Sequence, residues 1–263
     1  YAEPASFSAS AGLAIGYALF GIRRVLLKII IVAICAICLY QSGSRTFAGA
    51  IVVAGLLTGW IVYRHHRMRI LKIGVPLGLI AIIVVSTANL KTEELVESYA
   101  RSDSISTMTG RTVLWSAALS RLPERLLLGY GFTLGTSSIS GEVSRPPAAT
   151  GSLSQLQQPA SRAKLHSGYV QALLDSGIFG ALAYFAIFAV AAWRLIKHER
   201  TASYPFFCFV FFFCATANFT ETMIHSASVF RSVIGWTSIA LALSLARTPT
   251  MVGKSAIPRG PEK

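Results

Sequence analysis

The chain has 263 residues, of which 53% are hydrophobic and only 13% are charged, and its mean hydropathy is +0.57. This composition is too apolar for an ordinary soluble domain of the same length and indicates a membrane protein. The net charge of +13 does not indicate nucleic-acid binding, because the basic residues lie in short segments between apolar stretches and form no basic domain.

The apolar stretches predict an all-α, polytopic bundle of about seven transmembrane helices. A helix needs about 20 apolar residues to cross the hydrocarbon core, and the sequence lacks the alternation of barrel strands. The first two stretches are short and the chain opens without Met or a leader, so we expect one membrane domain, residues 1–263, of an N-terminally truncated chain. The stretches lie at about 7–20, 25–40, 46–63, 70–88, 168–193, 205–220 and 229–246.

The basic residues in the short connections predict the orientation of the bundle. The side richer in Lys and Arg faces the cytoplasm, while long loops escape this rule. The long loop at 89–165 is therefore expected to be extracytoplasmic. The side with Arg45 and Arg231 is poor in basic residues, whereas the other side carries Arg23, Arg24, Arg64, Arg67, Arg69, Arg194, Lys197 and Arg200.

An amphipathic helix is predicted within the long loop, in TVLWSAALSRL. Because its apolar residues recur at helical spacing, we expect it to lie along the outer membrane interface and to end at Pro123. The following LLLGYGF predicts a turn. The apolar positions of the helix are Leu114, Trp115, Ala118, Leu119 and Leu122.

Two arginines are candidates for binding phosphate groups. Arg111, in TGRT, opens the amphipathic helix, where free backbone N–H groups and a planar guanidinium suit a phosphate. The other interpretation is that it anchors the helix to anionic headgroups. Arg45, in QSGSRTF, stands at the outer mouth of the third span, where an arginine either marks a functional site or extends to the headgroups.

His166 opens the helix by which the loop re-enters the membrane. Imidazole can accept a proton from a hydroxyl at neutral pH, so His166 is a candidate general base, or else an ordinary interfacial histidine. Asp175 is excluded as its partner, because nine residues of continuous helix separate the two by roughly 13 Å along the axis.

Glu221, in ANFTETMIH, lies at the outer end of the sixth span. A carboxylate at that depth requires a cationic partner, which Arg45 or Arg111 could supply. Both a structural ion pair and a role in substrate binding stay open. His225 and Arg231 occupy the next outer connection and could join the same surface. The four cysteines lie in apolar runs, and no metal-ligand spacing appears, so we expect no metal site.

The motifs resemble those of the O-antigen ligase and polymerase superfamily of bacterial envelope glycan enzymes. The resemblance is carried by TGRTVLWSAALSRLPERLLLGYGF and LHSGYVQALLDSGIFGALAYF, and it covers about residues 40–225. TGRT and GYGF look most like the exopolysaccharide polymerase branch. SGSR matches an earlier Ser-Arg motif, and FTET is similar to a looser Thr-Glu motif. Ser167 stands where family members commonly have Asn.

The resemblance implies a multi-pass glycosyltransferase of the bacterial inner membrane, with its active face extracytoplasmic (periplasmic). It implies a glycan on an undecaprenyl diphosphate carrier as donor, with no metal or other cofactor. The acceptor is another repeat unit or the lipid A core of lipopolysaccharide. By position, Arg45 and Arg111 would hold the donor's diphosphate, with Glu221 also assigned to substrate binding, and His166 would assist deprotonation of the acceptor hydroxyl.

Two alternatives belong to other functional classes. A transporter or flippase of lipid-linked glycans predicts polar residues at mid-membrane depth, and the spans have hardly any. A noncatalytic scaffold would tolerate loss of His166 and Arg111. Within the enzyme class, the residues do not separate a ligase, a polymerase and a protein-directed oligosaccharyltransferase.

Overall fold

The regular structure of the described residues is helical. The computed structural model describes residues 4–42, 44–63, 108–132, 134–135, 165–197, 203–223 and 229–244, with isolated positions between 68 and 78. Helices cover six of the seven predicted spans, and the span at 70–88 lies almost wholly outside the described residues. The elements are α1 (Pro4–Phe20), α2 (Val25–Gln41), α3 (Arg45–Val62), α6 (Met108–Arg121), the 3-10 helix η4 (Leu122–Arg125), α8 (Gly168–Lys197), α9 (Tyr204–Ala217) and α10 (Val229–Ser244).

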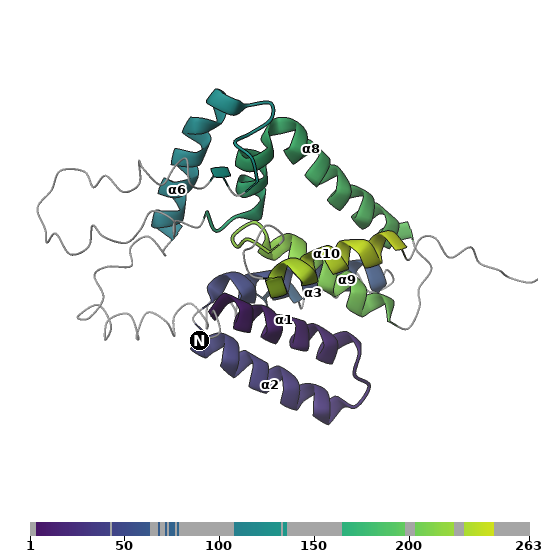
Figure 1. Cartoon of the computed structure of the whole chain (residues 1–263). Coiled ribbons are helices and arrows are strands. Elements are labelled where there is room, and N and C mark those ends of the chain that lie inside the picture. The colour runs from purple at the N-terminus through teal and green to yellow at the C-terminus, as the bar shows by residue number, and fades with distance from the viewer. Residues whose placement is uncertain are drawn as a thin grey trace, which may run out of the picture.

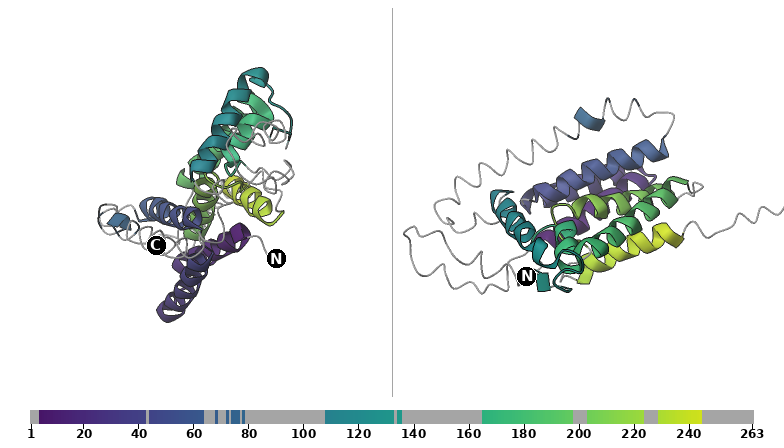
Figure 2. Two further views of the ribbon diagram at one scale, coloured as in Figure 1. Left: turned by 90° about the vertical axis from the view of Figure 1, so that its left-hand side faces the viewer. Right: turned by 90° about the horizontal axis from the view of Figure 1, so that it is seen from above.

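The helices form a bundle around α9, with a smaller unit at one end (Figure 1). α9 packs against α3, α10 and α1, and α2 covers α1. The top view shows α1, α3, α9 and α10 running nearly parallel to one another (Figure 2). The smaller unit consists of α6, η4 and the first part of α8, which lie together above the bundle (Figure 1).

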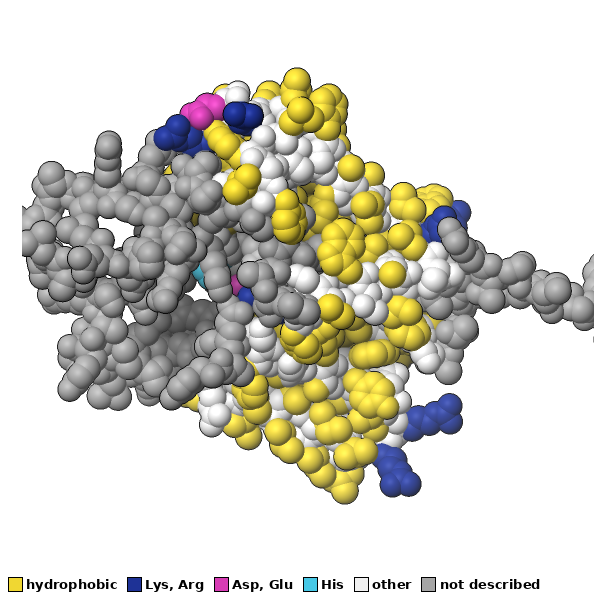
Figure 3. Space-filling view, in the orientation of Figure 1, with side chains coloured by type: hydrophobic (Ala, Val, Ile, Leu, Met, Phe, Trp, Pro, Cys, Tyr) yellow, Lys and Arg dark blue, Asp and Glu magenta, His cyan; other side chains and the backbone are white. Residues whose placement is uncertain are grey.

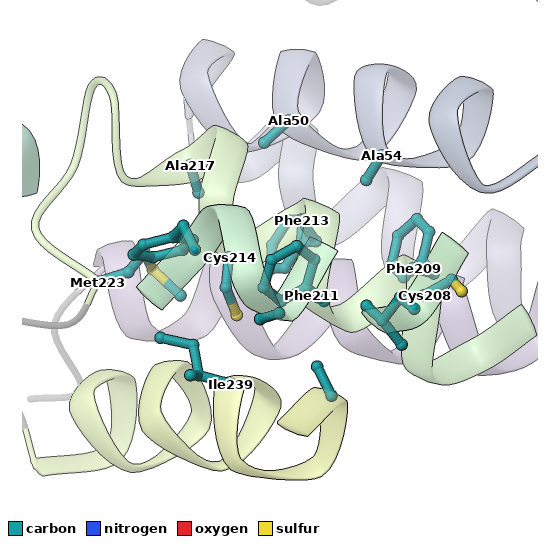
Figure 4. Packing of buried hydrophobic residues seen from close by; sticks show 14 of the residues in the cluster. Ala50, Ala54, Cys208, Phe209, Phe211, Phe213, Cys214, Ala217, Met223 and Ile239 are labelled. Carbon is teal, nitrogen blue, oxygen red and sulfur yellow. The ribbon is translucent and has the colours of Figure 1, made fainter. Parts of the chain in front are cut away.

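Small residues opposite large aromatic ones make up the core of the bundle. Phe209 and Phe213 of α9 are fully buried, and Ala50 and Ala54 of α3 lie over them (Figure 4). On α1, a Cβ at Gly16 would meet the ring of Phe209 at 2.1 Å. Small residues of this kind let apolar helices approach closely where water provides no driving force between them.

α8 is the described helix that is long and apolar enough to cross a membrane, with a mean hydropathy of 1.9 over its most apolar window. The other bundle helices are apolar but shorter. Hydrophobic side chains also cover much of the outer surface over α2 and α8 (Figure 3). On α2 the exposed ones include Leu26, Ile29, Ile30 and Ile37. Such a surface suits a lipid environment better than water.

Basic residues gather at one end of the bundle. Arg23 and Arg24 lie in the turn between α1 and α2, and Arg194 and Lys197 lie in the last turn of α8. Both places are at the right-hand end in Figure 1, and Figure 3 shows Lys and Arg side chains there. The described helices thus agree with the predicted alternation, which puts the start of α8 and the end of α9 at the opposite end.

Candidate active site

The long helix α8 is broken at Gly177. This residue has φ 65° and ψ −167°, so residues 168–176 and 178–197 form two straight segments that meet at a sharp angle (Figure 1). The sequence predicted one continuous helix over 168–193, and that expectation is corrected here. Glycine is the residue that accepts a positive φ at little cost, which explains why the break falls at this position.

The break is filled by residues 126–131, which we call the docked segment. A kink leaves helix carbonyls without their usual amide partners. Here the carbonyl oxygens of Leu174 and Asp175 accept hydrogen bonds from the N–H groups of Tyr130 (3.0 Å) and Gly131 (2.8 Å). On the other side of the break, the N–H of Ile178 donates to a carbonyl of the docked segment at 2.8 Å. The predicted turn at LLLGYGF is therefore built to fit the kink.

Side chains close the same corner. The buried carboxylate of Asp175 accepts hydrogen bonds from the N–H of Gly135 (3.1 Å) and from Nε2 of Gln171 (2.8 Å). At the surface, Tyr130 donates to Glu124 at 2.7 Å, and this bond, followed by that from Arg121, lowers the pKa of the Glu124 carboxyl. Asp175 thus serves loop docking, in line with its exclusion as the partner of His166.

α6 packs against α8 and against Leu165, the residue that precedes His166. Leu114 and Ala118 are buried in a small core with Leu165, whereas Leu119 is half exposed. One part of the predicted apolar face is thus buried against α8, and the part with Leu119 is exposed at the surface. Nε1 of Trp115 donates a hydrogen bond of 2.7 Å to the carbonyl of Leu165, the residue immediately before His166.

Removing this hydrogen bond should weaken the attachment of α6. We expect Trp115→Phe to lower the free energy of unfolding in detergent by about 1 kcal/mol, because it deletes one partly buried bond and keeps an aromatic ring. Trp236→Phe, at an exposed position on α10, is the matched control and should leave stability unchanged. Equal effects of the two substitutions would contradict the assigned role.

His166 is held in an unusual backbone conformation. Its φ is 49°, and among the non-glycine residues that the structure describes, His166 alone has a positive φ. The preceding residue is fixed to Trp115, and the next residue, Ser167, is buried and caps α8. The Ser167 hydroxyl accepts from the N–H of Val170 at 3.4 Å. Ser is a strong N-cap, so Ser167 suits the start of α8.

The turn after α9 (residues 218–223) is locked to the start of α8. Asn218 is fully buried, and its side chain donates to the hydroxyl of Tyr184 (2.9 Å) and accepts from the N–H of Met223 (3.0 Å). Its carbonyl accepts from the N–H of Gly168 at 2.9 Å. A Cβ at Gly168 would lie 2.0 Å from the Asn218 side chain, so only glycine permits this contact.

This turn brings Glu221 to His166. Oε2 of Glu221 lies 3.5 Å from Nδ1 of His166 and 3.6 Å from Nη1 of Arg231. The side chains of Glu221 and Arg231 are 9% and 3% exposed, whereas that of His166 is 32% exposed. The imidazole therefore faces outward from a buried ion pair.

The sequence proposed Arg45 or Arg111 as a cation for Glu221, and these pairings stay predictions, because both side chains lie outside the described residues. Among the described side chains, Arg231 pairs with Glu221. Sequence reasoning had placed Arg231 only on the same outer connection, because no spacing within one helix links α9 to α10. His225, in that connection, lies outside the described residues.

The backbones of the other two candidates lie toward the same end of the molecule. Arg45 begins α3, and the ring of Phe47 packs at a tilt against that of Phe213 toward the end of α9, with ring centroids 5.9 Å apart. Arg111 lies in the first turn of α6, one turn ahead of the residue that bonds to Leu165. The side chains of Arg45 and Arg111 are outside the described part of the chain.

Metal-binding groups are not clustered in the described residues. No three His, Cys, Asp or Glu side chains there come together as metal ligands. The cysteines are free thiols, and Cys208 and Cys214 are buried in the apolar core.

A bundle of apolar helices with ionisable groups buried near one end defines an integral membrane protein with a polar site. A family model described as O-antigen ligase matches residues 30–185, more than half of the chain. The chain belongs to the O-antigen ligase family, which confirms the resemblance found in the motifs. No curated protein and no solved structure matches it. Membership implies a ligase- or polymerase-type function in the synthesis of surface polysaccharides from lipid-linked glycans.

Proposed function

We propose that the protein transfers a glycan from an undecaprenyl-diphosphate carrier to an acceptor hydroxyl at the extracytoplasmic face of the inner membrane. The observation that carries this proposal is the placement of His166. Its imidazole is partly exposed, its backbone has a positive φ, and its Nδ1 faces a buried carboxylate. A sparsely populated backbone conformation persists only where its surroundings enforce it, and such positions concentrate at functional sites.

The reaction follows from these groups. Nε2 of His166 accepts the proton of the acceptor hydroxyl while the hydroxyl oxygen attacks the anomeric carbon of the donor. The bond from this carbon to the diphosphate breaks, and undecaprenyl diphosphate leaves with the bonding electrons. Arg45 and Arg111 stabilise the charge that develops on the diphosphate, because guanidinium groups pair with phosphate oxygens in a bidentate manner. Both arginines begin or nearly begin a helix.

The competing functions predict different arrangements of charge. A flippase requires polar groups along a path through the membrane. The buried charged residues described here are Asp175, Glu221 and Arg231. They lie in the kink of α8 and beside His166, which favours a site at one face. A scaffold needs no buried ion pair beside an outward-facing imidazole.

The decisive experiment uses the protein reconstituted in vesicles with a purified undecaprenyl-diphosphate-linked oligosaccharide. We expect formation of a longer or transferred glycan together with free undecaprenyl diphosphate, at the same rate with and without EDTA, because guanidinium groups take the role of a metal. Because the TGRT and GYGF motifs look most like those of polymerases, the first acceptor to test is a second molecule of the donor. Lipid A core is the second acceptor to test. Translocation of donor without a glycan product would overturn the proposal in favour of a flippase, and EDTA-sensitive transfer restored by Mg²⁺ would overturn the metal-free mechanism.

A further inference from the structure

We propose that Arg231 is a positioning residue for the general base. Arg231 would hold the Glu221 carboxylate correctly turned, and Glu221 would hold the proton of neutral His166 on Nδ1, so that Nε2 is free to accept. This inference rests on the proposed function of His166. Arg231 acts through another residue and needs no contact with the donor or the acceptor.

The position of each charge relative to its helix supports this role. Arg231 lies in the first turn of α10, and Glu221 follows the end of α9, where its N–H donates to the carbonyl of Ala217 at 2.8 Å. A helix carries partial positive charge at its start and partial negative charge at its end. Each side chain therefore lies at the helix end that disfavours its charge, and helix capping does not account for the pair.

The burial of Glu221 and Arg231 supports the same role. Both side chains are at least nine-tenths buried, so each ion has lost most of its hydration. Removal of one partner leaves an uncompensated buried charge, while replacement of both by apolar residues is frequently neutral or stabilising. A buried ion pair therefore adds little to the stability of the fold. Orientation of the adjacent imidazole is a role that would explain why this pair is present.

Arg231 and His166 share one oxygen atom of Glu221. Nη1 of Arg231 and Nδ1 of His166 both approach Oε2 of Glu221, at 3.6 and 3.5 Å. Any rotation of the carboxylate caused by Arg231 therefore acts directly on the imidazole. In neutral histidine one ring nitrogen carries the proton and the other accepts, and a carboxylate at Nδ1 selects the form that accepts at Nε2. Contacts of this length between catalytic groups commonly tighten to hydrogen bonds only when substrate is bound.

The exposures give the order of the three groups. His166 is about one-third exposed, Glu221 is nearly buried, and Arg231 is the most deeply buried. Substrate reaching the outward side of the imidazole would therefore meet His166 first, with Glu221 and Arg231 behind it. This order predicts an effect on turnover rather than on donor affinity.

The kinetic test compares Arg231→Met, Arg231→Lys, Glu221→Gln and the double substitution Arg231→Met with Glu221→Gln. We expect Arg231→Met to lower kcat about 10- to 100-fold, a part of the whole contribution of a general base, with KM for the donor changed less than about twofold. Arg231→Lys should recover much of the rate. The double variant should be no slower than Glu221→Gln alone, because the residues act in series. Arg194→Met is the matched control, since Arg194 bonds the carbonyl of Leu243 at the other end of α10.

A spectroscopic readout separates this inference from the proposed function. In ¹⁵N-histidine-labelled protein, with the His166 signal identified by its loss in His166→Asn, we expect the proton of neutral His166 on Nδ1 in the native protein. In Arg231→Met it should shift toward Nε2. An unchanged tautomer together with native kcat in Arg231→Met would overturn the role of Arg231 even if His166 proves essential. Full transfer by His166→Asn would instead overturn the proposed function, and the tautomer of the native protein would still test the positioning. If Arg231→Met fails to fold, Arg231→Lys and Glu221→Gln decide by the same two readouts.

Discussion

His166→Asn is expected to reduce glycan transfer about 100- to 10,000-fold while leaving the amount of folded protein in the membrane unchanged. This range is what a positioned general base contributes to a proton transfer. Asparagine is the appropriate replacement because it tolerates a positive φ better than most residues and so keeps the backbone of His166, at 49°, but brings no base. The measurement is the initial rate of transfer in vesicles at saturating donor.

His166→Ala provides a second comparison. Alanine lacks both the base and the tolerance for a positive φ, so we expect the same loss of transfer plus a loss of about 1–2 kcal/mol in stability. Trp236→Phe, at an exposed position on α10, is the control, and it should keep native transfer. A rate for His166→Asn within threefold of the native rate would contradict the assignment of His166 as general base.

The positions of the bundle helices could be predicted from apolar runs, because a segment in lipid must satisfy its backbone hydrogen bonds internally as a helix and must expose apolar side chains to the lipid. α2 at Val25–Gln41 and α10 at Val229–Ser244 begin at the residues where the predicted spans begin. The Arg and His segments could be found from their motifs. The family match then covers Arg45, Arg111 and His166 within one range, 30–185. Their roles stay a proposal.

The pairing of Glu221 with Arg231 could not be predicted, because it depends on how α8, α9 and α10 pack and not on a spacing within one helix. The sequence named Arg45 and Arg111 as cations because of their motifs, and it placed Arg231, which has no motif, only on the same outer surface. The one signal in the sequence was the presence of Arg231 inside the apolar stretch at 229–246, where a charge is costly unless it is paired.

The kink at Gly177 was missed for a different reason. Glycine is frequent in transmembrane helices, so its presence in LLDSGIFG did not distinguish a break from an ordinary helix position. The docked segment supplies the missing hydrogen bonds from residues more than 40 positions earlier in the chain. Long-range partners of this kind leave no periodic trace in the sequence.

Gly177→Ala is expected to have the largest effect on stability, a loss of about 3 kcal/mol or more in the free energy of unfolding. Alanine at φ 65° costs about 1–2 kcal/mol by itself. Its Cβ would also lie 2.4 Å from the backbone carbonyl carbon of Leu127 and 2.6 Å from the nitrogen of Gly129. These are backbone atoms, so the chain can relieve the clash only by releasing the docked segment or by straightening α8.

Release of the docked segment can be measured separately from unfolding, because Arg125 lies exposed just ahead of it. We expect trypsin to cleave after Arg125 in Gly177→Ala under conditions that leave the native protein intact. Gly49→Ala and Gly55→Ala on α3 are matched controls, since a Cβ at either position meets nothing within 4 Å. They should be neutral or more stable by up to about 1 kcal/mol, as expected for alanine replacing glycine in a helix. Glycan transfer should also fall when the docked segment is released. The docked segment bonds to the first part of α8, and that part begins next to His166, at the cap formed by Ser167. Native stability and native trypsin resistance in Gly177→Ala would show that the kink does not depend on glycine.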